Sequence, residues 1–363
     1  MKHIVTIVGA RPQFIKAAVL SRLIRSVSWN TKFHETLIHT GQHYDANMSE
    51  VFFNDMKIPR PDIHLNIGGG THGEMTGKML IQIEAELIRL KPDLVVVYGD
   101  TNSTLAGALA ASKLHIPVAH IEAGLRSFYK RMPEEQNRIL TDHLAEWLFC
   151  PTEIAVNNLA DEGITRGVYT VGDIMLDASL YYRQILKDEK TVGTNRLKNI
   201  QGLPFEVVDG SYALATVHRA ENTDDPEKLA NIVGALNELK TNIILPLHPR
   251  TLKCIAEANL QFNSNVFVIE PIGYLEMLEL EMNCTCIITD SGGIQKEAYF
   301  LQKPCITLRE QTEWVETVES GWNILVGSNK KRIKEAFKNI SIPKYYPNYY
   351  GNGNTGNEIL IQL

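Results

Sequence analysis

The chain has 363 residues, of which 44% are hydrophobic and 21% are charged, a composition typical of globular proteins and a length that predicts about two domains. The formal net charge of −6 argues against a nucleic-acid partner, which would require a basic surface stripe, but it leaves room for a small anionic ligand bound by local cations. The N-terminus lacks the pattern of a signal peptide and no apolar run approaches the roughly 20 residues of a membrane span, so we expect a cytoplasmic protein with no membrane partner.

The first half of the chain alternates apolar strands with amphipathic helices. We expect strands at 3–9, 35–41, 93–100 and 116–124, helices at 11–26, 73–91 and 103–115, and a helix that runs into a short strand over 134–151. Nearly continuous apolar strands between helices are typical of a parallel sheet covered on both faces. The segment 168–186 looks like the exit from this first domain.

Two glycine-containing segments of this half are candidate phosphate sites. The turn "GARPQFIK" (9–16) places Arg11 and Lys16 where a strand meets a helix, and two cations beside free helix N–H groups suit an anion. The alternative is a solvated helix start. A literal GxGxxG lies in "GGGTHG" (68–73), but a dinucleotide fingerprint belongs after the first strand of the sheet, so we favour a loop ahead of a helix.

Three acids of this half follow strands or open a helix. Asp100 ends the strand in "VVVYGDTNST", Glu122 ends the next strand in "HIEAGLRS", and Glu134 opens the helix in "MPEEQNR". Each alone has a structural explanation, because Asp100 could cap the following helix and Glu134 could favour the helix dipole. Several acids in one partly desolvated site would instead raise some pKa values toward neutrality, which suits proton transfer.

The alternation restarts in the second half. We expect strands at 212–218, 242–249, 265–271, 285–290 and 304–309, with helices at about 226–240, 250–259, 274–283 and 292–302. The second domain is therefore also α/β. Two such sheets usually face each other across a cleft, with ligand loops at the carboxyl ends of their strands.

The stretch "TDSGGIQKE" (289–297) has the most specific pattern. A strand ends at Asp290, and Ser291, Gly292 and Gly293 open a helix, where glycines let backbone N–H groups approach a phosphate. Glu297 could then hold ribose hydroxyls. The alternative is that Ser291 is a plain N-cap and Glu297 lies on a solvated face.

Two further features of this half concern phosphate and sulfur. In "ATVHRAEN", His218 and Arg219 follow a strand and suggest a second phosphate contact. The whole chain contains five cysteines, and their odd number and irregular spacing argue against a disulfide framework. Cys284 and Cys286 would share one face of a strand, where we favour packing over a metal or redox role.

Together these segments resemble the non-hydrolysing UDP-N-acetylglucosamine 2-epimerases. The resemblance covers almost the whole chain through "GARPQFIK", "GDTNST", "HIEAGLRS", "MPEEQNR", "HRAEN" and "TDSGGIQKE", in the order of the family. It implies an α/β fold of the glycosyltransferase-B type, with two Rossmann-like domains whose parallel sheets face a cleft. It also implies a homodimer, a UDP-sugar substrate, and no cofactor or metal.

The resemblance divides the chain and assigns roles to the candidate residues. The N-terminal domain, 1–170, would carry the carboxylates, the C-terminal domain, 171–349, would bind UDP, and the segment 350–363 would pack back on the first domain. The implied catalytic residues are Asp100, Glu122 and Glu134 for proton transfer and positioning, and His218 for the diphosphate leaving group. The implied binding residues are Arg11, Lys16 and Arg219 at the nucleotide and its phosphates, Ser291, Gly292 and Gly293 at the phosphates, Glu297 at the ribose, and Pro271 and Met277 beside the uracil.

The implied chemistry explains the need for acids. The C2 proton of a sugar is not acidic, but departure of UDP places positive charge at C1 and acidifies it. Elimination then gives a glycal and UDP, and reprotonation on the other face followed by return of UDP inverts C2. Both intermediates must stay trapped, so we expect the cleft to close.

Some positions depart from the common family pattern. Arg219 precedes Ala220, and "TEWVE" (312–316) stands where the family often has Thr-Glu-Arg-Pro-Glu. Gln42 and His43 match a segment that contacts a second, allosteric substrate in some members, whereas Asp45 does not. These variants resemble the subset acting on modified sugars such as UDP-2,3-diacetamido-2,3-dideoxyglucuronate.

A modified substrate of that kind carries an extra carboxylate, which would need another cation. The candidates are Arg309, Arg126 and His72. Other possibilities are a hydrolysing 2-epimerase, a glycosyltransferase-like protein and a sensor without chemistry. The set of carboxylates favours the epimerase, because a transferase needs fewer acids and a sensor none.

Overall fold

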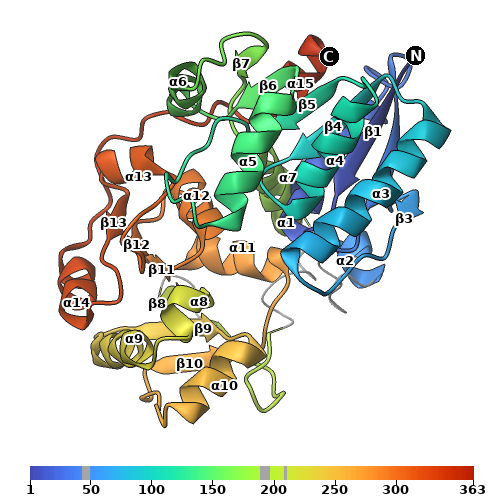
Figure 1. Cartoon of the computed structure of the whole chain (residues 1–363). Helices are drawn as coiled ribbons and strands as arrows, with labels where there is room; N and C mark the ends of the chain where they lie inside the picture. The colour runs from blue at the N-terminus through green and yellow to red at the C-terminus, as the bar shows by residue number, and fades with distance from the viewer. Residues whose placement is uncertain (43–49, 189–196, 208–210) are drawn as a thin grey trace. The chain divides into compact units, whose positions relative to one another are not determined.

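The computed structural model describes residues 1–42, 50–188, 197–207 and 211–363, so His43 and Asp45 lie outside the described residues. The chain forms two compact units, residues 1–180 with 348–363 (unit 1) and residues 181–347 (unit 2). Each is an α/β unit built on one sheet (Figure 1).

Unit 1 contains a seven-stranded sheet of order β3-β2-β1-β4-β5-β6-β7. Its strands are β1 (Lys2–Val8), β2 (Phe33–His39), β3 (Ile63–His64), β4 (Leu94–Tyr98), β5 (Val118–Ile121), β6 (Trp147–Cys150) and β7 (Val168–Thr170). All neighbouring strands run parallel. Every residue of β4 is buried, as expected for a central strand covered on both faces.

The helices of unit 1 cover both faces of its sheet. They are α1 (Arg11–Ile24), α2 (Glu50–Asp55), α3 (His72–Leu90), α4 (Asn102–Lys113), α5 (Pro133–Leu144), α6 (Glu153–Asp161), α7 (Ile174–Asp188) and α15 (Thr355–Gln362), with α7 crossing into unit 2. On one face, α3 contributes Met79, Ile83 and Leu87 to a buried cluster with β1 and β4.

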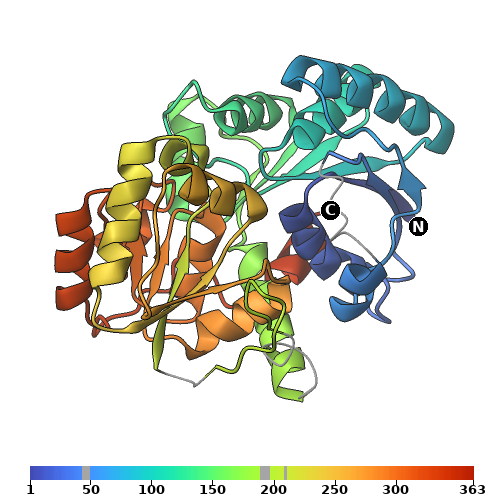
Figure 2. The ribbon, with the colours of Figure 1, turned by 90° about the horizontal axis from the view of Figure 1, so that it is seen from below.

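The C-terminal helix α15 packs against α1, as Figure 2 shows for the red and blue helices. The carboxylate of Asp177 on α7 accepts the N–H groups of Thr355 (3.1 Å) and Gly356 (2.9 Å) at the start of α15. Trp29 donates its indole N–H to Asn357 at 3.0 Å. The N-terminus of α15 is thus held by a carboxylate, which suits the helix dipole.

Unit 2 contains a six-stranded sheet of order β10-β9-β8-β11-β12-β13, again parallel throughout. Its strands are β8 (Tyr212–Thr216), β9 (Asn242–Pro246), β10 (Val266–Ile269), β11 (Ile287–Thr289), β12 (Cys305–Thr307) and β13 (Asn323–Leu325). Its helices are α8 (Ala220–Thr223), α9 (Pro226–Glu238), α10 (Pro249–Glu257), α11 (Tyr274–Asn283), α12 (Gly292–Phe300), α13 (Val315–Glu319) and α14 (Lys330–Asn339).

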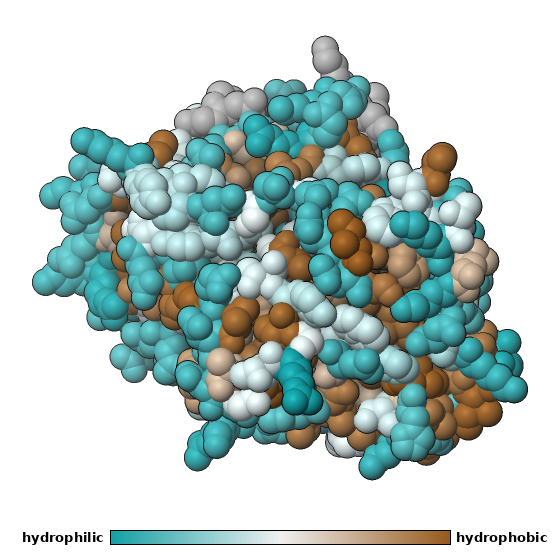
Figure 3. Space-filling model, turned by 90° about the horizontal axis from the view of Figure 1, so that it is seen from above, coloured by the Kyte–Doolittle hydropathy of each residue, from teal (hydrophilic) through white to brown (hydrophobic). Residues whose placement is uncertain are grey.

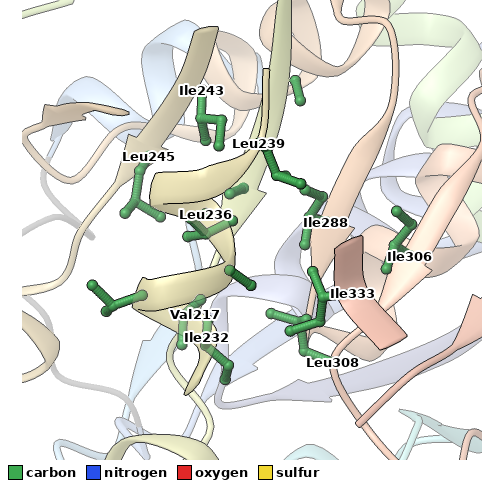
Figure 4. Packing of buried hydrophobic residues seen from close by; sticks show 14 of the residues in the cluster. Val217, Ile232, Leu236, Leu239, Ile243, Leu245, Ile288, Ile306, Leu308 and Ile333 are labelled. Carbon is green, nitrogen blue, oxygen red and sulfur yellow. The ribbon is translucent and has the colours of Figure 1, made fainter. Parts of the chain in front are cut away.

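The main core of unit 2 lies between its sheet and the helices α9 and α14. Figure 4 shows Ile232 and Leu236 of α9, Ile333 of α14 and Ile288 of β11 among the side chains of this core. Ile333 is fully buried although α14 is rich in lysine. The five cysteines of the chain are free, and all except Cys254 are buried.

The predicted α/β class with two parallel sheets is confirmed, and the predicted strands lie within a few residues of the observed ones. Both sheets reverse their strand order at one point, between β1 and β4 in unit 1 and between β8 and β11 in unit 2. In open α/β sheets, ligands bind beyond the carboxyl ends of the strands at such a switch point. No described helix has the combination of length and apolarity that crossing a membrane demands.

The backbone turn after β5 depends on Gly124, whose φ is +78°. A Cβ atom there would lie 2.3 Å from the carbonyl oxygen of Ala155, so Gly124→Ala adds a clash to the left-handed strain. We expect this variant to lose roughly 2–4 kcal/mol of unfolding free energy in urea titrations.

Gly163 is the matched control, because its φ is +80° but nothing lies within 4 Å of the position of its Cβ. Gly163→Ala should lose only about 1–2 kcal/mol. Equal losses in the two variants would contradict the role assigned to the contact with Ala155.

Candidate active site

The candidate residues of unit 1 lie around the switch point of its sheet. Arg11 is the first residue of α1 and Lys16 lies one turn further on, after β1. Asp100 follows β4, Glu122 follows β5, and Glu134 lies in the first turn of α5. We use the name acid cluster for the three carboxylates Asp100, Glu122 and Glu134 together with the two cations that pair with them, Lys16 and Arg138.

Gln13 connects the two turns that flank the switch point. Its side-chain oxygen accepts the N–H groups of Gly9 (2.8 Å) and Ala10 (3.0 Å), and its amide donates to the carbonyl of Tyr98 (2.7 Å). The same amide contacts the hydroxyl of Thr101 at 3.0 Å. Gln13 is 3% exposed, so these bonds fix the turn that carries Asp100.

The carboxylate of Asp100 is not the cap of the helix that follows it. Thr101 is the N-cap of α4, and its hydroxyl accepts the N–H of Thr104 at 3.3 Å. The Asp100 side chain keeps 36% of its surface exposed and pairs with Arg138, with 2.5 Å between Oδ2 and a guanidinium nitrogen. The capping explanation of Asp100 is therefore wrong, because its carboxylate contacts Arg138 instead of the start of α4.

The charges of the acid cluster act on one another. Partial desolvation raises the pKa of Asp100; the charges of Arg138 and Lys16 oppose this rise, whereas those of Glu122 and Glu134 add to it. The structure thus brings Asp100, Glu122 and Glu134 within electrostatic reach. A carboxyl group with a raised pKa can hold and release a proton closer to neutral pH.

Glu122 is held in a strained conformation beside Lys16. Its φ of +72° is unusual for a residue with a side chain, and such strain concentrates at functional sites. Its carboxylate pairs with the ammonium group of Lys16, and the two side chains are 8% and 13% exposed. A Cβ atom at Gly99 would lie 3.3 Å from Glu122 Oε2, so glycine lets the β4 turn approach this ion pair.

A buried polar network holds the backbone of the turn after β4. His120 on β5 contacts the carbonyl oxygen of Gly99 (2.8 Å) with one ring nitrogen and Asp142 on α5 (2.7 Å) with the other. Arg126 completes the network, since it donates to Asp142 at 2.7 Å and to both carboxylate oxygens of Glu162 at 2.7 Å.

The same contacts exclude one of the three candidate cations for an extra substrate carboxylate. The Arg126 side chain is only 1% exposed and its charge is matched by two acids, so its assignment as that cation is wrong. Arg309 in unit 2 pairs with Glu313 at 3.1 Å and is 10% exposed. His72 is exposed and its ring contacts Asn102 on α4 at 3.1 Å.

The neighbouring acids Glu134 and Glu135 differ in their contacts. Glu135 is 1% exposed and accepts the N–H groups of Ser127 (2.9 Å) and Phe128 (2.8 Å), so it holds the loop after β5. Glu134 is half-buried in the first turn of α5. Of the two, Glu134 is the one whose charge acts on Asp100.

In unit 2, Asp290 organises the end of β8 at the switch point. Its fully buried carboxylate accepts the N–H groups of His218 (3.1 Å) and Arg219 (3.0 Å) and the amide of Asn222 (3.1 Å). Nδ1 of His218 lies 3.1 Å from Asp290 Oδ1, and the His218 side chain is 50% exposed. Burial alone would raise the pKa of Asp290, but the contacts with His218, Arg219 and Asn222 outweigh it and lower that pKa.

The carboxylate of Asp290 therefore orients the imidazole of His218 from behind. A ring held at Nδ1 presents its Nε2 outward, where it can contact a ligand. Arg219 is the half-buried N-cap of α8, so its side chain also begins just beyond the end of β8.

The start of α12 follows Asp290 directly. Ser291 is the N-cap, and its hydroxyl accepts the N–H of Ile294 at 3.4 Å, as the simpler explanation expected. A Cβ at Gly292 would lie 2.4 Å from Glu313 Oε1, and one at Gly293 would meet only the Ser291 hydroxyl at 3.9 Å. Glu297 is 6% exposed, so the alternative of a solvated face is wrong for this residue.

The last two candidates are Pro271 and Met277. Pro271 is exposed just after β10, and Met277 is half-buried on α11. The sequence interpretation missed Gln13 and Arg138 as site residues and treated Asp290 only as the end of a strand. Arg138 had a visible signal, because it lies four residues after Glu134 and so on the same face of the helix.

Two Rossmann-like units with charged groups at each switch point define a two-domain α/β protein of the glycosyltransferase-B type. The calicheamicin glycosyltransferase CalG4 shares this fold, with a TM-score of 0.52 at 12% identity. The family model described as UDP-N-acetylglucosamine 2-epimerase matches residues 25–363. The chain belongs to this family.

Individual relatives extend this finding. The chain is 52% identical to a UDP-N-acetylglucosamine 2-epimerase homolog of Methanococcus maripaludis, over 99% of both chains. It is 54% identical to the UDP-2,3-diacetamido-2,3-dideoxy-D-glucuronate 2-epimerase of Pseudomonas aeruginosa, over 92% of this chain and 90% of that one. The solved UDP-GlcNAc 2-epimerase of Methanocaldococcus jannaschii, in complex with UDP-GlcNAc and UDP, has a TM-score of 0.88 at 47% identity over 100% of this chain and 99% of the other.

Proposed function

We propose that the protein is a non-hydrolysing 2-epimerase that interconverts UDP-N-acetylglucosamine and UDP-N-acetylmannosamine. The observation that carries the proposal is the acid cluster, in which Asp100, with its raised pKa, lies within reach of the charges of Glu122 and Glu134 at the switch point of one sheet. Membership of the epimerase family supports it. So do related enzymes that bear this name, among them one solved with UDP-GlcNAc and UDP.

In the proposed reaction, the bond between C1 and the diphosphate oxygen breaks and a carboxylate of the acid cluster takes the proton from C2. This leaves a C1–C2 double bond and free UDP. A protonated acid then returns a proton to C2 from the other face, and UDP adds again at C1. Asp100 suits one of these transfers because its raised pKa brings proton exchange closer to neutral pH than in an ordinary aspartate.

The other members of the cluster support this chemistry. Lys16 keeps Glu122 in an ion pair, which stabilises a negative charge there. Arg138 holds the carboxylate of Asp100 in one orientation, and Glu134 positions the sugar or completes the proton transfer.

Unit 2 would bind the nucleotide in this proposal. His218, oriented by Asp290, would stabilise the charge of the departing diphosphate. Ser291, Gly292 and Gly293 would hold the phosphates at the start of α12, together with Arg219, and Arg11 would contact the nucleotide from unit 1. Glu297 would bind the ribose, and Pro271 and Met277 would flank the uracil.

A second candidate substrate is a modified UDP-sugar such as UDP-2,3-diacetamido-2,3-dideoxyglucuronate. The 54% identity to the Pseudomonas aeruginosa enzyme of that name favours it. So do Trp314 and Val315, which replace the Arg-Pro pair that is frequent in the family.

We also propose that the protein is a homodimer. Exposed isoleucines on α3, Ile81 at 69% and Ile88 at 56%, would suit a contact with a second copy. Figure 3 shows hydrophobic residues interrupting the hydrophilic surface of the face that it displays.

Proton exchange at C2 tests the proposal. The protein is incubated with UDP-N-acetylglucosamine in D2O and the sugar is followed by NMR, with a sample lacking protein as the control. We expect deuterium at C2 together with a manno product. Exchange only with the diacetamido-uronate would select the second substrate, release of free sugar would select a hydrolysing enzyme, and no exchange with either sugar would overturn the epimerase.

A further inference from the structure

We propose that Lys296 is a further binding residue of the phosphate site at the start of α12, and that Trp314 positions its ammonium group. The inference rests on the proposed function, in which Ser291, Gly292 and Gly293 hold the phosphates. Lys296 lies in the second turn of α12, and Trp314 is the N-cap of α13. The ammonium group of Lys296 lies 4.2 Å from the centre of the Trp314 ring, which is the distance of a cation–π contact.

Both members of this pair are almost completely buried. Lys296 is 2% exposed and Trp314 is 4% exposed. Taking an ammonium group out of water is costly unless other groups stabilise its charge, and an aromatic face attracts a cation more strongly when the contact is desolvated. A lysine buried at this cost, where an apolar side chain would also pack, points to a use for its charge.

The helix directs Lys296 toward the phosphate site. Gly292 and Gly293 precede Lys296 by four and three residues, so all three lie on one face of α12. The indole nitrogen of Trp314 lies 3.7 Å from the place that a Cβ atom at Gly292 would occupy. Because helical side chains also lean toward the N-terminus of their helix, the ammonium group lies alongside the first turn of α12.

A buried network fixes the turn that carries Trp314 to the same helix. Thr312 donates its hydroxyl to the side-chain oxygen of Gln295 at 2.7 Å and accepts the N–H of Trp314 at 3.1 Å. Gln295 is fully buried on α12 and also accepts from the Asn323 amide at 3.1 Å. The ring is held against α12 by these contacts, so the place for the ammonium group is formed in advance.

The phosphate site needs a cation because a carboxylate borders it. Glu313 lies so close to Gly292 that a Cβ atom there would displace its carboxylate. Arg309 pairs with Glu313 at 3.1 Å and with Glu221 at 3.5 Å, so its charge is shared between two acids. A diphosphate brings further negative charge, and the charge of Lys296 beside the first turn of α12 favours its binding.

Residue 314 is aromatic where the family often has arginine. An arginine here would place a second cation beside Lys296, and the two charges would repel each other. The Trp314 indole instead stabilises the ammonium group. In this chain the cation beside Gly292 therefore comes from the helix and not from the turn.

The test measures the affinities for UDP and for uridine by calorimetry in the full-length protein, because only UDP carries phosphates. Lys296→Met removes the charge and keeps an unbranched side chain that can pack against the indole. It should bind UDP about tenfold more weakly and uridine within about twofold of wild type. Trp314→Leu keeps the lysine without the ring that positions it, and should bind UDP about threefold more weakly with uridine affinity again retained.

A double variant separates the charge from the packing. Lys296→Met combined with Trp314→Arg moves the cation from the helix to the turn. It should bind UDP at least about threefold more tightly than Lys296→Met alone, with no change for uridine. Loss of packing alone would give no such recovery.

Lys303→Met is the matched control, because Lys303 follows the other end of α12 and donates to the carbonyl of Cys284 at 2.8 Å; it should bind both ligands as wild type does. Thermal unfolding shows which variants are folded, and Trp314→Leu makes the same comparison if Lys296→Met is not. Equal losses for UDP and uridine, wild-type affinity for UDP in both single variants, or no recovery in the double variant would overturn the role of Lys296. Failure of the wild-type protein itself to bind UDP would instead overturn the proposed function, and this inference with it.

Discussion

Replacing Asp100 by asparagine should lower the rate of C2 proton exchange by at least about a hundredfold, with UDP binding largely retained. The reason is chemical, because an amide cannot exchange a proton as a carboxyl group does and a general acid–base group contributes typically 10²–10⁴-fold. The asparagine amide has the same shape as the carboxylate, and its oxygen can still accept a hydrogen bond from Arg138. In the wild-type protein, Arg138 contacts the Asp100 carboxylate at 2.5 Å. Deuterium incorporation followed by NMR measures the rate, and calorimetry measures binding of UDP.

Glu74→Gln provides the matched control for this substitution. Glu74 is half-exposed on α3, where it pairs with Lys78 four residues further on. Losing this surface carboxylate should leave exchange unchanged. Exchange at the wild-type rate in Asp100→Asn would show that another group moves the proton and would remove Asp100 from the proposed mechanism.

The second large effect concerns stability. Asp142→Ala should lower the free energy of unfolding at pH 7 by about 3–5 kcal/mol, the usual cost of removing one partner of a buried ion pair. The Asp142 carboxylate is fully buried and contacts His120 and Arg126, each at 2.7 Å. Its loss leaves the Arg126 guanidinium with Glu162 alone, and it also frees the His120 ring that supports the Gly99 carbonyl. Urea titration of both proteins measures the difference.

The contacts of Asp142 with His120 and Arg126 also make its contribution to stability depend on pH, with a sign that follows from the pKa of Asp142. Burial would raise the pKa of Asp142, but His120 and Arg126 outweigh it and hold that pKa below its usual range. Such a group adds stability above its unfolded pKa of about 3.9 and loses it as pH falls through the lower folded value. The gap between wild type and Asp142→Ala should therefore narrow below about pH 4.

A surface ion pair provides the comparison for Asp142. Glu86 and Arg89 pair on α3 at 2.5 Å with the arginine side chain 60% exposed, so Glu86→Ala should cost less than about 1 kcal/mol. If Asp142→Ala loses no more unfolding free energy than Glu86→Ala, the buried network stabilises the protein no more than a surface ion pair does.

The sequence was most informative where burial is uniform. β4 was predictable because all of its residues are apolar and buried, and the α/β class followed from several such runs. Helix α14 was missed although Ile333, Ala336 and Phe337 have the i, i+3, i+4 spacing of a helix, because the many basic residues of "KKRIKEAFKN" leave only a narrow apolar stripe. β13 was missed for a related reason, since three residues at a sheet edge carry no pattern of their own.

From the sequence, the candidate site could be predicted only as separate residues that follow the ends of strands. Asp100, Glu122 and Asp290 were visible because a carboxylate after an apolar run stands out. Their partners depend on tertiary contacts, since Asp100 and Arg138 are separated by 38 residues and His218 and Asp290 by 72. The network of His120, Asp142 and Arg126 likewise depends on α5 packing behind β5, which no local pattern encodes.

The last helix imposes an order on how the protein is made. Helix α15 belongs to the unit that begins the chain, yet a ribosome must finish the whole of unit 2 before it synthesises residues 355–362. At typical elongation rates this separates the two parts of unit 1 by on the order of ten seconds. During that interval the face of α1 that α15 covers stays open on the nascent chain, so unit 1 completes its packing only after unit 2 has emerged.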